Sequence, residues 1–165
     1  ILLALVLFSD IGGIFQLYGT ISIYMLTITL YGSPLSKITK IKLFRYFMTW
    51  RRELGLATFW FYFAHGLGNT LKYGLGPQSF TGLNNNLFYG GLAGMGLTIM
   101  ALTSNDYAVR KLKRNWKRLH RIVYGVYFLA LYHIGLVEGS FTKLYFLGSL
   151  YIVLKTIQYL KIKRI

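Results

Sequence analysis

Histidine is the residue through which this chain of 165 residues can carry out chemistry, and it occurs three times, at His65, His120 and His133. The chain has no cysteine, which excludes disulfides, thiolate catalysis, iron–sulfur ligation and covalent haem attachment through C-x-x-C-H. Its four acidic residues are too few and too scattered for a carboxylate pair or a cage for a hard metal ion. This distribution argues against hydrolytic chemistry and leaves the imidazoles as the reactive groups.

His65 and His133 each follow the last arginine of a basic stretch by nearly the same number of residues. His65 lies 13 residues after Arg52, and His133 lies 12 residues after Arg121. At a helical rise of ~1.5 Å per residue, each histidine is about 18–20 Å along its helix, so the spacing predicts two imidazoles at one depth. Neutral imidazole is a strong axial ligand of iron, and such a pair can hold a haem between two helices. The alternative is that each histidine only forms hydrogen bonds between helices.

His120 lies at the start of the same apolar stretch as His133, beside Arg118. It could ligate a second haem whose propionates meet the neighbouring arginines, or it could be one more basic residue at a membrane interface. The other histidine-bearing segment offers no imidazole at this depth, because Arg51 or Arg52 occupies the corresponding position. On an ideal helix His120 and His133 would point roughly 140° apart, so spacing leaves both alternatives open.

The elements that must position these histidines are apolar. Hydrophobic residues make up 55% of the chain, charged residues make up 14%, and the mean hydropathy is +0.46, which indicates a membrane protein. We predict a single domain over residues 1–165, an all-α polytopic transmembrane bundle of about six helices, the first truncated. Turns are expected at 32–34 and 138–140, a loop at 72–86, and an interfacial helix within 37–52. The predicted apolar helices cover residues 1–8, 14–30, 53–71, 87–102, 115–137 and 144–160.

Basic residues explain the net charge of +15 without a nucleic-acid partner. If the apolar segments span a membrane, only Lys72 and Lys143 of the 19 Lys and Arg residues fall on one side. The positive-inside rule then predicts that the basic loops and the C-terminus face the cytoplasm or its equivalent. The sequence shows no internal repeat.

Small residues are expected where helices or a cofactor approach closely. Gly90-x-x-x-Gly94 would let a neighbouring helix come near, and it lacks the order and the preceding strand of a dinucleotide fingerprint. Thr58, Gly68 and Ala130 lie near the azimuths of His65 and His133. They would leave room for a macrocycle or would serve helix packing.

Several motifs together resemble the ferric-reductase-like transmembrane domain family and, within it, the haem-binding membrane subunits of bacterial methionine sulfoxide reductase systems. The likeness covers residues 18–164. It rests on Arg51-Arg52-x-Leu54-Gly55 before His65, on Leu102-Thr103-Ser104, and on Trp116-x-x-Leu119-His120 with His133 thirteen residues later.

The resemblance implies a six-helix protein with b-type haem that carries electrons from a cytoplasmic-side flavin or quinol to an acceptor across the membrane. It implies haem ligation by His65, His120 and His133, and cofactor contacts from Arg51, Arg52 and Arg118. One haem is expected, a second remains open, and FMN or a quinone is a further candidate. The larger oxidases and ferric reductases of the family have paired histidines on both helices and carry flavin and nicotinamide domains. This sequence has neither, so the electron donor must be a quinol or another protein.

We therefore predict an electron-transfer component of an oxidoreductase system in a bacterial inner membrane or an equivalent energy-transducing membrane. Its expected partners are the lipid bilayer and a redox partner protein or larger membrane complex, with no nucleic acid. The alternative is a structural accessory subunit of a respiratory or photosynthetic complex that retains this fold. A small transporter is less favoured, because few polar groups occur near the predicted midplane.

Overall fold

The computed structural model describes residues 2–39, 41–74, 76, 79 and 85–163. Within these residues there is no strand, and the predicted all-α class is confirmed. The helices in chain order are α1 (Leu2–Thr39), α2 (Lys42–Thr49), α3 (Arg51–Tyr73), α4 (Asn86–Leu102), α5 (Asp106–Leu112), α6 (Arg114–Leu119), the 3₁₀ helix η2 (His120–Ile122), α7 (Val123–Glu138) and α8 (Thr142–Lys163).

Helix α1 is one continuous helix of 38 residues, so the predicted division into two N-terminal segments is wrong. The predicted stop at residues 32–34 is also wrong. Gly32 leaves space for the Met48 side chain of α2, and a Cβ there would overlap it. Pro34 lacks the N–H that would bond the Leu30 carbonyl, but its side chain is fully buried, and tertiary packing holds the helix across this point.

The long helices form two main packed pairs, α1 with α3 and α4 with α7, and α8 lies against α1 and α7. At the centre, Tyr127 and Leu131 of α7 are fully buried. The Tyr127 hydroxyl lies 3.2 Å from the Thr27 hydroxyl, which joins α7 to α1. Helix α7 is therefore the central element of the bundle.

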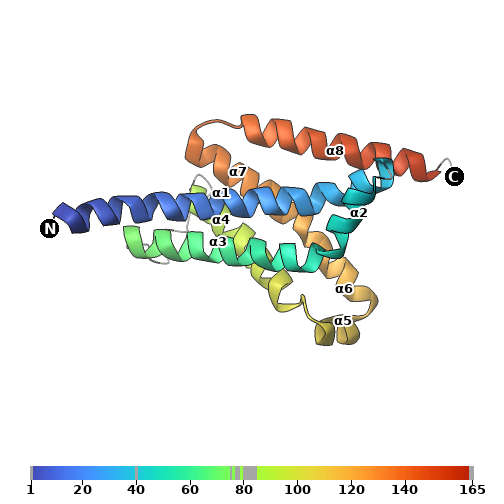
Figure 1. Ribbon diagram of the computed structural model, residues 1–165, viewed down its shortest axis with the longest axis horizontal. Helices are drawn as coiled ribbons and strands as arrows, with labels where there is room; N and C mark the ends of the chain where they lie inside the picture. Colours follow the sequence, from blue (N-terminus) through green and yellow to red (C-terminus); the bar gives the residue numbers. More distant parts are fainter. Residues whose placement is uncertain (1, 40, 75, 77–78, 80–84, 164–165) are drawn as a thin grey trace.

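Basic segments gather at one end of the bundle. Figure 1 shows α2, α5, α6 and the C-terminal end of α8 at this end, with the end of α3 and the α7–α8 turn at the other. Helices α3 and α7 terminate there at glycines in the left-handed region, Gly74 (φ 59°) and Gly139 (φ 65°). The predicted turn at 138–140 is confirmed, and the helices run between a basic end and a mostly uncharged end.

Two helices among the described residues, Gly13–Thr39 and Arg114–Glu138, are long and apolar enough to cross a membrane. Asn86–Leu102 with Asp106–Leu112 would add a third span, but these two helices meet at an angle of 91°. Helix α5 therefore runs across the direction of α4, at the basic end of the bundle (Figure 1).

The region predicted as one helix over 115–137 is helical throughout, but three of its residues form a 3₁₀ turn. Its first turns form α6, residues His120–Ile122 form the 3₁₀ helix η2, and α7 begins only at Val123. A 3₁₀ turn advances with about three residues per turn instead of 3.6, so angles calculated for an ideal α-helix do not apply across it. His120 and His133 therefore belong to different elements.

Candidate functional site

His65 is anchored by the backbone of the neighbouring helix α1. Its Nδ1 lies 2.8 Å from the carbonyl oxygen of Phe15. One turn later on α1, Gly19 gives the imidazole room: a Cβ at that position would lie 2.8 Å from Nδ1 and 2.9 Å from Cε1. Any larger residue at position 19 would push the ring away from the carbonyl.

The Phe15 carbonyl determines which nitrogen of His65 carries the proton. A carbonyl oxygen can only accept, so Nδ1 must donate, and the lone pair lies on Nε2. The Asn69 amide nitrogen is also 3.2 Å from Nδ1, but it donates a shorter bond of 2.8 Å to the backbone carbonyl of His65. No hydrogen bond to Nε2 occurs among the residues described, so this nitrogen is available to a ligand.

His133 is held in the same way by α4. Its Nδ1 lies 2.7 Å from the carbonyl oxygen of Asn86. Gly90 follows one turn later, and a Cβ there would lie 3.0 Å from Nδ1. His133 is thus fixed with the proton on Nδ1 and the lone pair on Nε2, the same tautomer as His65.

We call this arrangement a carbonyl–glycine seat. In it, the backbone carbonyl of residue i on one helix accepts a hydrogen bond from a ring on a neighbouring helix, and the glycine at i+4 leaves space for that ring. One seat joins α1 to α3 and the other joins α4 to α7, the two main packed pairs. Tyr62, one turn before His65 on α3, donates to the carbonyl of Gly90, whose missing Cβ admits the His133 ring, so a direct contact links the helix of one seat to the other seat. A histidine that donates Nδ1–H to a carbonyl and leaves Nε2 free has the second-shell arrangement typical of metal ligands.

His120 has a different setting at the basic end. Its Nε2 lies 3.0 Å from the Thr103 hydroxyl, and its ring stacks on Trp116 at 4.0 Å between centroids. The Thr103 hydroxyl has one proton, which it donates to the Ile99 carbonyl at 2.7 Å. The hydroxyl must then accept from His120, which places the imidazole proton on Nε2 and the lone pair on Nδ1.

The predicted arginines lie at the same end as His120, not with His65 and His133. Arg51 is the first residue of α3, and α3 begins at the basic end. Arg52 donates to the Ser104 carbonyl at 2.9 Å and forms an ion pair with Asp106 at 2.7 Å. Arg118 is exposed and lies 3.5 Å from the Asn115 side chain. Of the predicted site residues, the structure holds His65 and His133 in seats of the same kind and places His120 with the arginines at the basic end.

The small residues near the histidines serve helix packing. Thr58 is fully buried, and its carbonyl accepts a hydrogen bond of 2.9 Å from Ser22. Gly68 faces the Phe15 ring, which a Cβ would overlap. The predicted close approach at Gly90 and Gly94 is confirmed, because the His133 ring and the Tyr62 side chain occupy the space that a Cβ would need.

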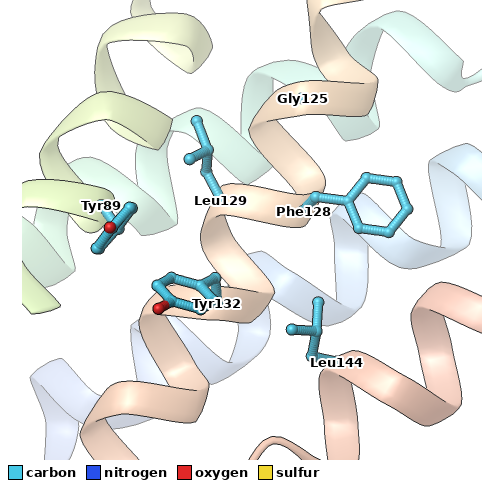
Figure 2. A pocket seen from close by; sticks show the side chains of 6 residues that line it. All are labelled: Tyr89, Gly125, Phe128, Leu129, Tyr132 and Leu144. Carbon is cyan, nitrogen blue, oxygen red and sulfur yellow. The ribbon is translucent and has the colours of Figure 1, made fainter. Parts of the chain in front are cut away.

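An apolar groove of about 540 Å³ runs between α4, α7 and α8. Figure 2 shows its lining residues, which are Tyr89, Gly125, Phe128, Leu129, Tyr132 and Leu144. None of the three histidines lines it. Within the described ranges, no group of three or more His, Cys, Asp or Glu side chains is placed to hold a metal ion.

The residues that complete the seats are not apparent from the sequence. Phe15 and Asn86 contribute only a backbone carbonyl, which any residue type would supply. Gly19 carries the one available signal, a glycine within an apolar helix, and Gly90 resembles an ordinary packing glycine.

Comparisons with known proteins show which family the chain resembles. Residues 13–131 match the family described as ferric reductase like transmembrane component. The protein-methionine-sulfoxide reductase heme-binding subunit MsrQ of Agrobacterium fabrum is 32% identical over 139 residues, which cover 82% of this chain and 63% of that protein. The subunit of the same name from Brucella ovis is 35% identical over 113 residues, covering 66% of this chain and 50% of that protein.

The chain therefore spans about half to two thirds of the length of these relatives. No solved structure matches it. The family match includes His65, His120 and the α1 and α4 residues of both seats, ends two residues before His133, and covers well over half of the sequence. The chain belongs to the ferric reductase like transmembrane component family.

Proposed function

We propose that this chain is a membrane electron-transfer subunit that holds one b-type haem between His65 and His133. The observation that carries the proposal is the pair of carbonyl–glycine seats, which fix both imidazoles as the same tautomer with Nε2 free. The names of the two relatives, both heme-binding subunits, support haem as the ligand. Since the chain has no cysteine, the haem would be held without a covalent bond.

The donor set fits this group. His65 and His133 would hold the haem through their Nε2 atoms, and neutral imidazole is a common protein ligand of haem iron. When bound, haem iron gains and loses one electron at a time. The carbonyls of Phe15 and Asn86 orient the rings and make each imidazole a stronger electron donor through its Nδ1–H bond. Gly19 and Gly90 allow the rings to reach those carbonyls.

The charge asymmetry supports a direction for the transfer. The basic end of the bundle would face the cytoplasm under the positive-inside rule, and His65 and His133 lie well along their helices from that end. The donor would be a flavin carried by another protein, such as FMN, or a quinol. The acceptor would lie across the membrane, and the relatives' names favour a protein-methionine-sulfoxide reductase as that partner.

A single haem follows from the contrast between the histidines. His120 uses Nε2–H to bond Thr103, and its ring stacks on Trp116. We assign His120 a structural role at the basic end. Arg51, Arg52 and Arg118 lie at the same end, and we assign them to membrane orientation and to the connection between helices.

A reduced-minus-oxidised absorption spectrum of the purified full chain tests the proposal. The parent protein should show the α band of a b-type haem, and His65→Ala and His133→Ala should each lose it. Added imidazole should restore part of the band in either variant, since it can enter the space left by the ring. A parent protein without the band, or a band unchanged in both variants, would refute the assignment.

A further inference from the structure

Tyr62 projects from the helix that carries His65 to the helix that seats His133. Its hydroxyl donates to the Gly90 carbonyl at 3.2 Å, and it occupies the position that a Cβ on Gly94 would take. This is a third carbonyl–glycine seat, formed by the carbonyl of residue 90 and the glycine at 94. The ring that enters it is a tyrosine.

Gly90 therefore belongs to two seats. Its missing Cβ admits the His133 ring, and its carbonyl accepts the Tyr62 hydroxyl. Helix α3 packs mainly on α1, and α4 packs mainly on α7. Tyr62 thus joins the pair of helices that holds His65 to the pair that holds His133, three residues from His65 on the same helix.

We propose that Tyr62 is a positioning residue that fixes the separation of the two imidazoles and so determines whether both can bind one iron at once. The inference rests on the proposed haem site. The spacing matters because metal–imidazole bonds are short and tolerate little deviation, so ligands are effective only when the surrounding residues hold them in place. In an apolar interior the Tyr62 hydroxyl and the Gly90 carbonyl have few other hydrogen-bond partners. Loss of their bond would let the α1–α3 pair and the α4–α7 pair move apart.

Loss of the Tyr62 hydroxyl should release one imidazole part of the time. In that fraction of the molecules a bound haem would be held by one imidazole only, and in the reduced state it would react with carbon monoxide. One neutral hydrogen bond shifts an equilibrium by about fivefold, which sets the expected size of the effect.

The experiment compares the full chain in lipid nanodiscs with its Tyr62→Phe and Tyr132→Phe variants. Tyr132 is the matched control: it precedes His133 and contacts Tyr89 at 4.6 Å, and its hydroxyl makes no hydrogen bond in the described part of the chain. Carbon monoxide is added to reduced protein, and the reactive fraction is measured from the spectrum. We expect about a fivefold increase in Tyr62→Phe and no change in Tyr132→Phe.

A second variant and a second readout make the test independent of folding defects. Gly94→Ala places a methyl group where the Tyr62 hydroxyl lies, so it should raise the reactive fraction at least as much as Tyr62→Phe. Titration of haem into haem-free protein should show weaker binding by a similar factor in both variants.

The outcomes are distinct. A normal haem band with an unchanged reactive fraction and unchanged haem affinity in Tyr62→Phe overturns the inference and leaves the haem site intact. An equal increase in Tyr132→Phe also overturns it, because the effect would then not depend on the Gly90 bond. A parent protein without haem overturns the proposed function and this inference with it.

Discussion

The two ends of this bundle use histidine in opposite ways. At one end His65 and His133 donate from Nδ1 to backbone carbonyls and keep Nε2 free. At the basic end His120 donates from Nε2 to Thr103 and stacks on a tryptophan. The same residue type therefore keeps its lone pair on Nε2 at one end and on Nδ1 at the other.

The difference comes from the acceptor that the neighbouring helix offers. A glycine one turn after a helical carbonyl lets an imidazole reach that carbonyl edge-on, as at Gly19 and Gly90. At the basic end the acceptor is a side-chain hydroxyl, which Ile99 already holds in place. The hydrogen-bond partner on the neighbouring element therefore decides which ring nitrogen of each histidine keeps its lone pair.

The largest effect on haem affinity is expected from a substitution that occupies the space of a seat while both histidines are kept. Gly19→Ala places a methyl group 2.8 Å from His65 Nδ1, so the ring must shift and its bond to Phe15 is lost. Overpacking together with a lost hydrogen bond costs about 2–3 kcal/mol, so haem affinity should fall by more than tenfold. Haem titration into the purified variant measures this.

The matched control is Gly66→Ala on α3, beside His65, where a Cβ would meet no atom within 4 Å. It changes helix propensity by the same amount as Gly19→Ala does, and it should leave haem affinity unchanged. Gly90→Ala should have a smaller effect than Gly19→Ala, because its Cβ would lie 3.0 Å from His133 Nδ1. Equal affinities in Gly19→Ala and Gly66→Ala would show that the seat does not matter.

Removal of His120 tests the other end. His120→Ala should retain the haem band in full while losing the Thr103 bond and the stack on Trp116. We expect a loss of about 1–2 kcal/mol in the free energy of unfolding, seen as a fall of several degrees in Tm. His120→Gln retains an N–H donor and should recover part of the stability. A well-folded His120→Ala protein with a diminished haem band would instead identify His120 as a ligand.

The sequence predicts the parts of this site that depend on distance along a helix. The spacings from Arg52 to His65 and from Arg121 to His133 predict two imidazoles at similar depth, and in the structure each bonds a backbone carbonyl of a neighbouring helix. The tautomers could not be predicted, because Phe15 and Asn86 act through backbone atoms that carry no sequence signal.

The fold, like the site, could be predicted from the sequence only in part. Each half of the site consists of a seat-bearing helix, a basic surface segment and a histidine-bearing helix, with 50 residues from Phe15 to His65 and 47 from Asn86 to His133. The order of these elements repeats, but the amino-acid sequence does not, because apolar helices of different composition can pack in the same way. Helix α1 was predicted to stop at residues 32–34 because glycine and proline usually end helices. Here the Met48 contact and the burial of Pro34 outweigh that local preference.

The smallest effect should come from the ion pairs, of which the described residues contain one at each end. Arg52–Asp106 lies at the basic end, with side chains 49% and 73% exposed, and Lys143–Glu138 lies at the α7–α8 turn, with side chains 51% and 41% exposed. Because solvent and salt screen both pairs, a double-mutant cycle with Arg52→Gln and Asp106→Asn should give a coupling of about 0.5 kcal/mol or less that vanishes in high salt. The cycle with Lys143→Gln and Glu138→Gln should give a similar value. A much larger coupling for Arg52–Asp106 that persists in high salt would mean that this ion pair stabilises the basic end more than the stack of His120 on Trp116 does. The two ends would then differ in their charge interactions and not in how they use histidine.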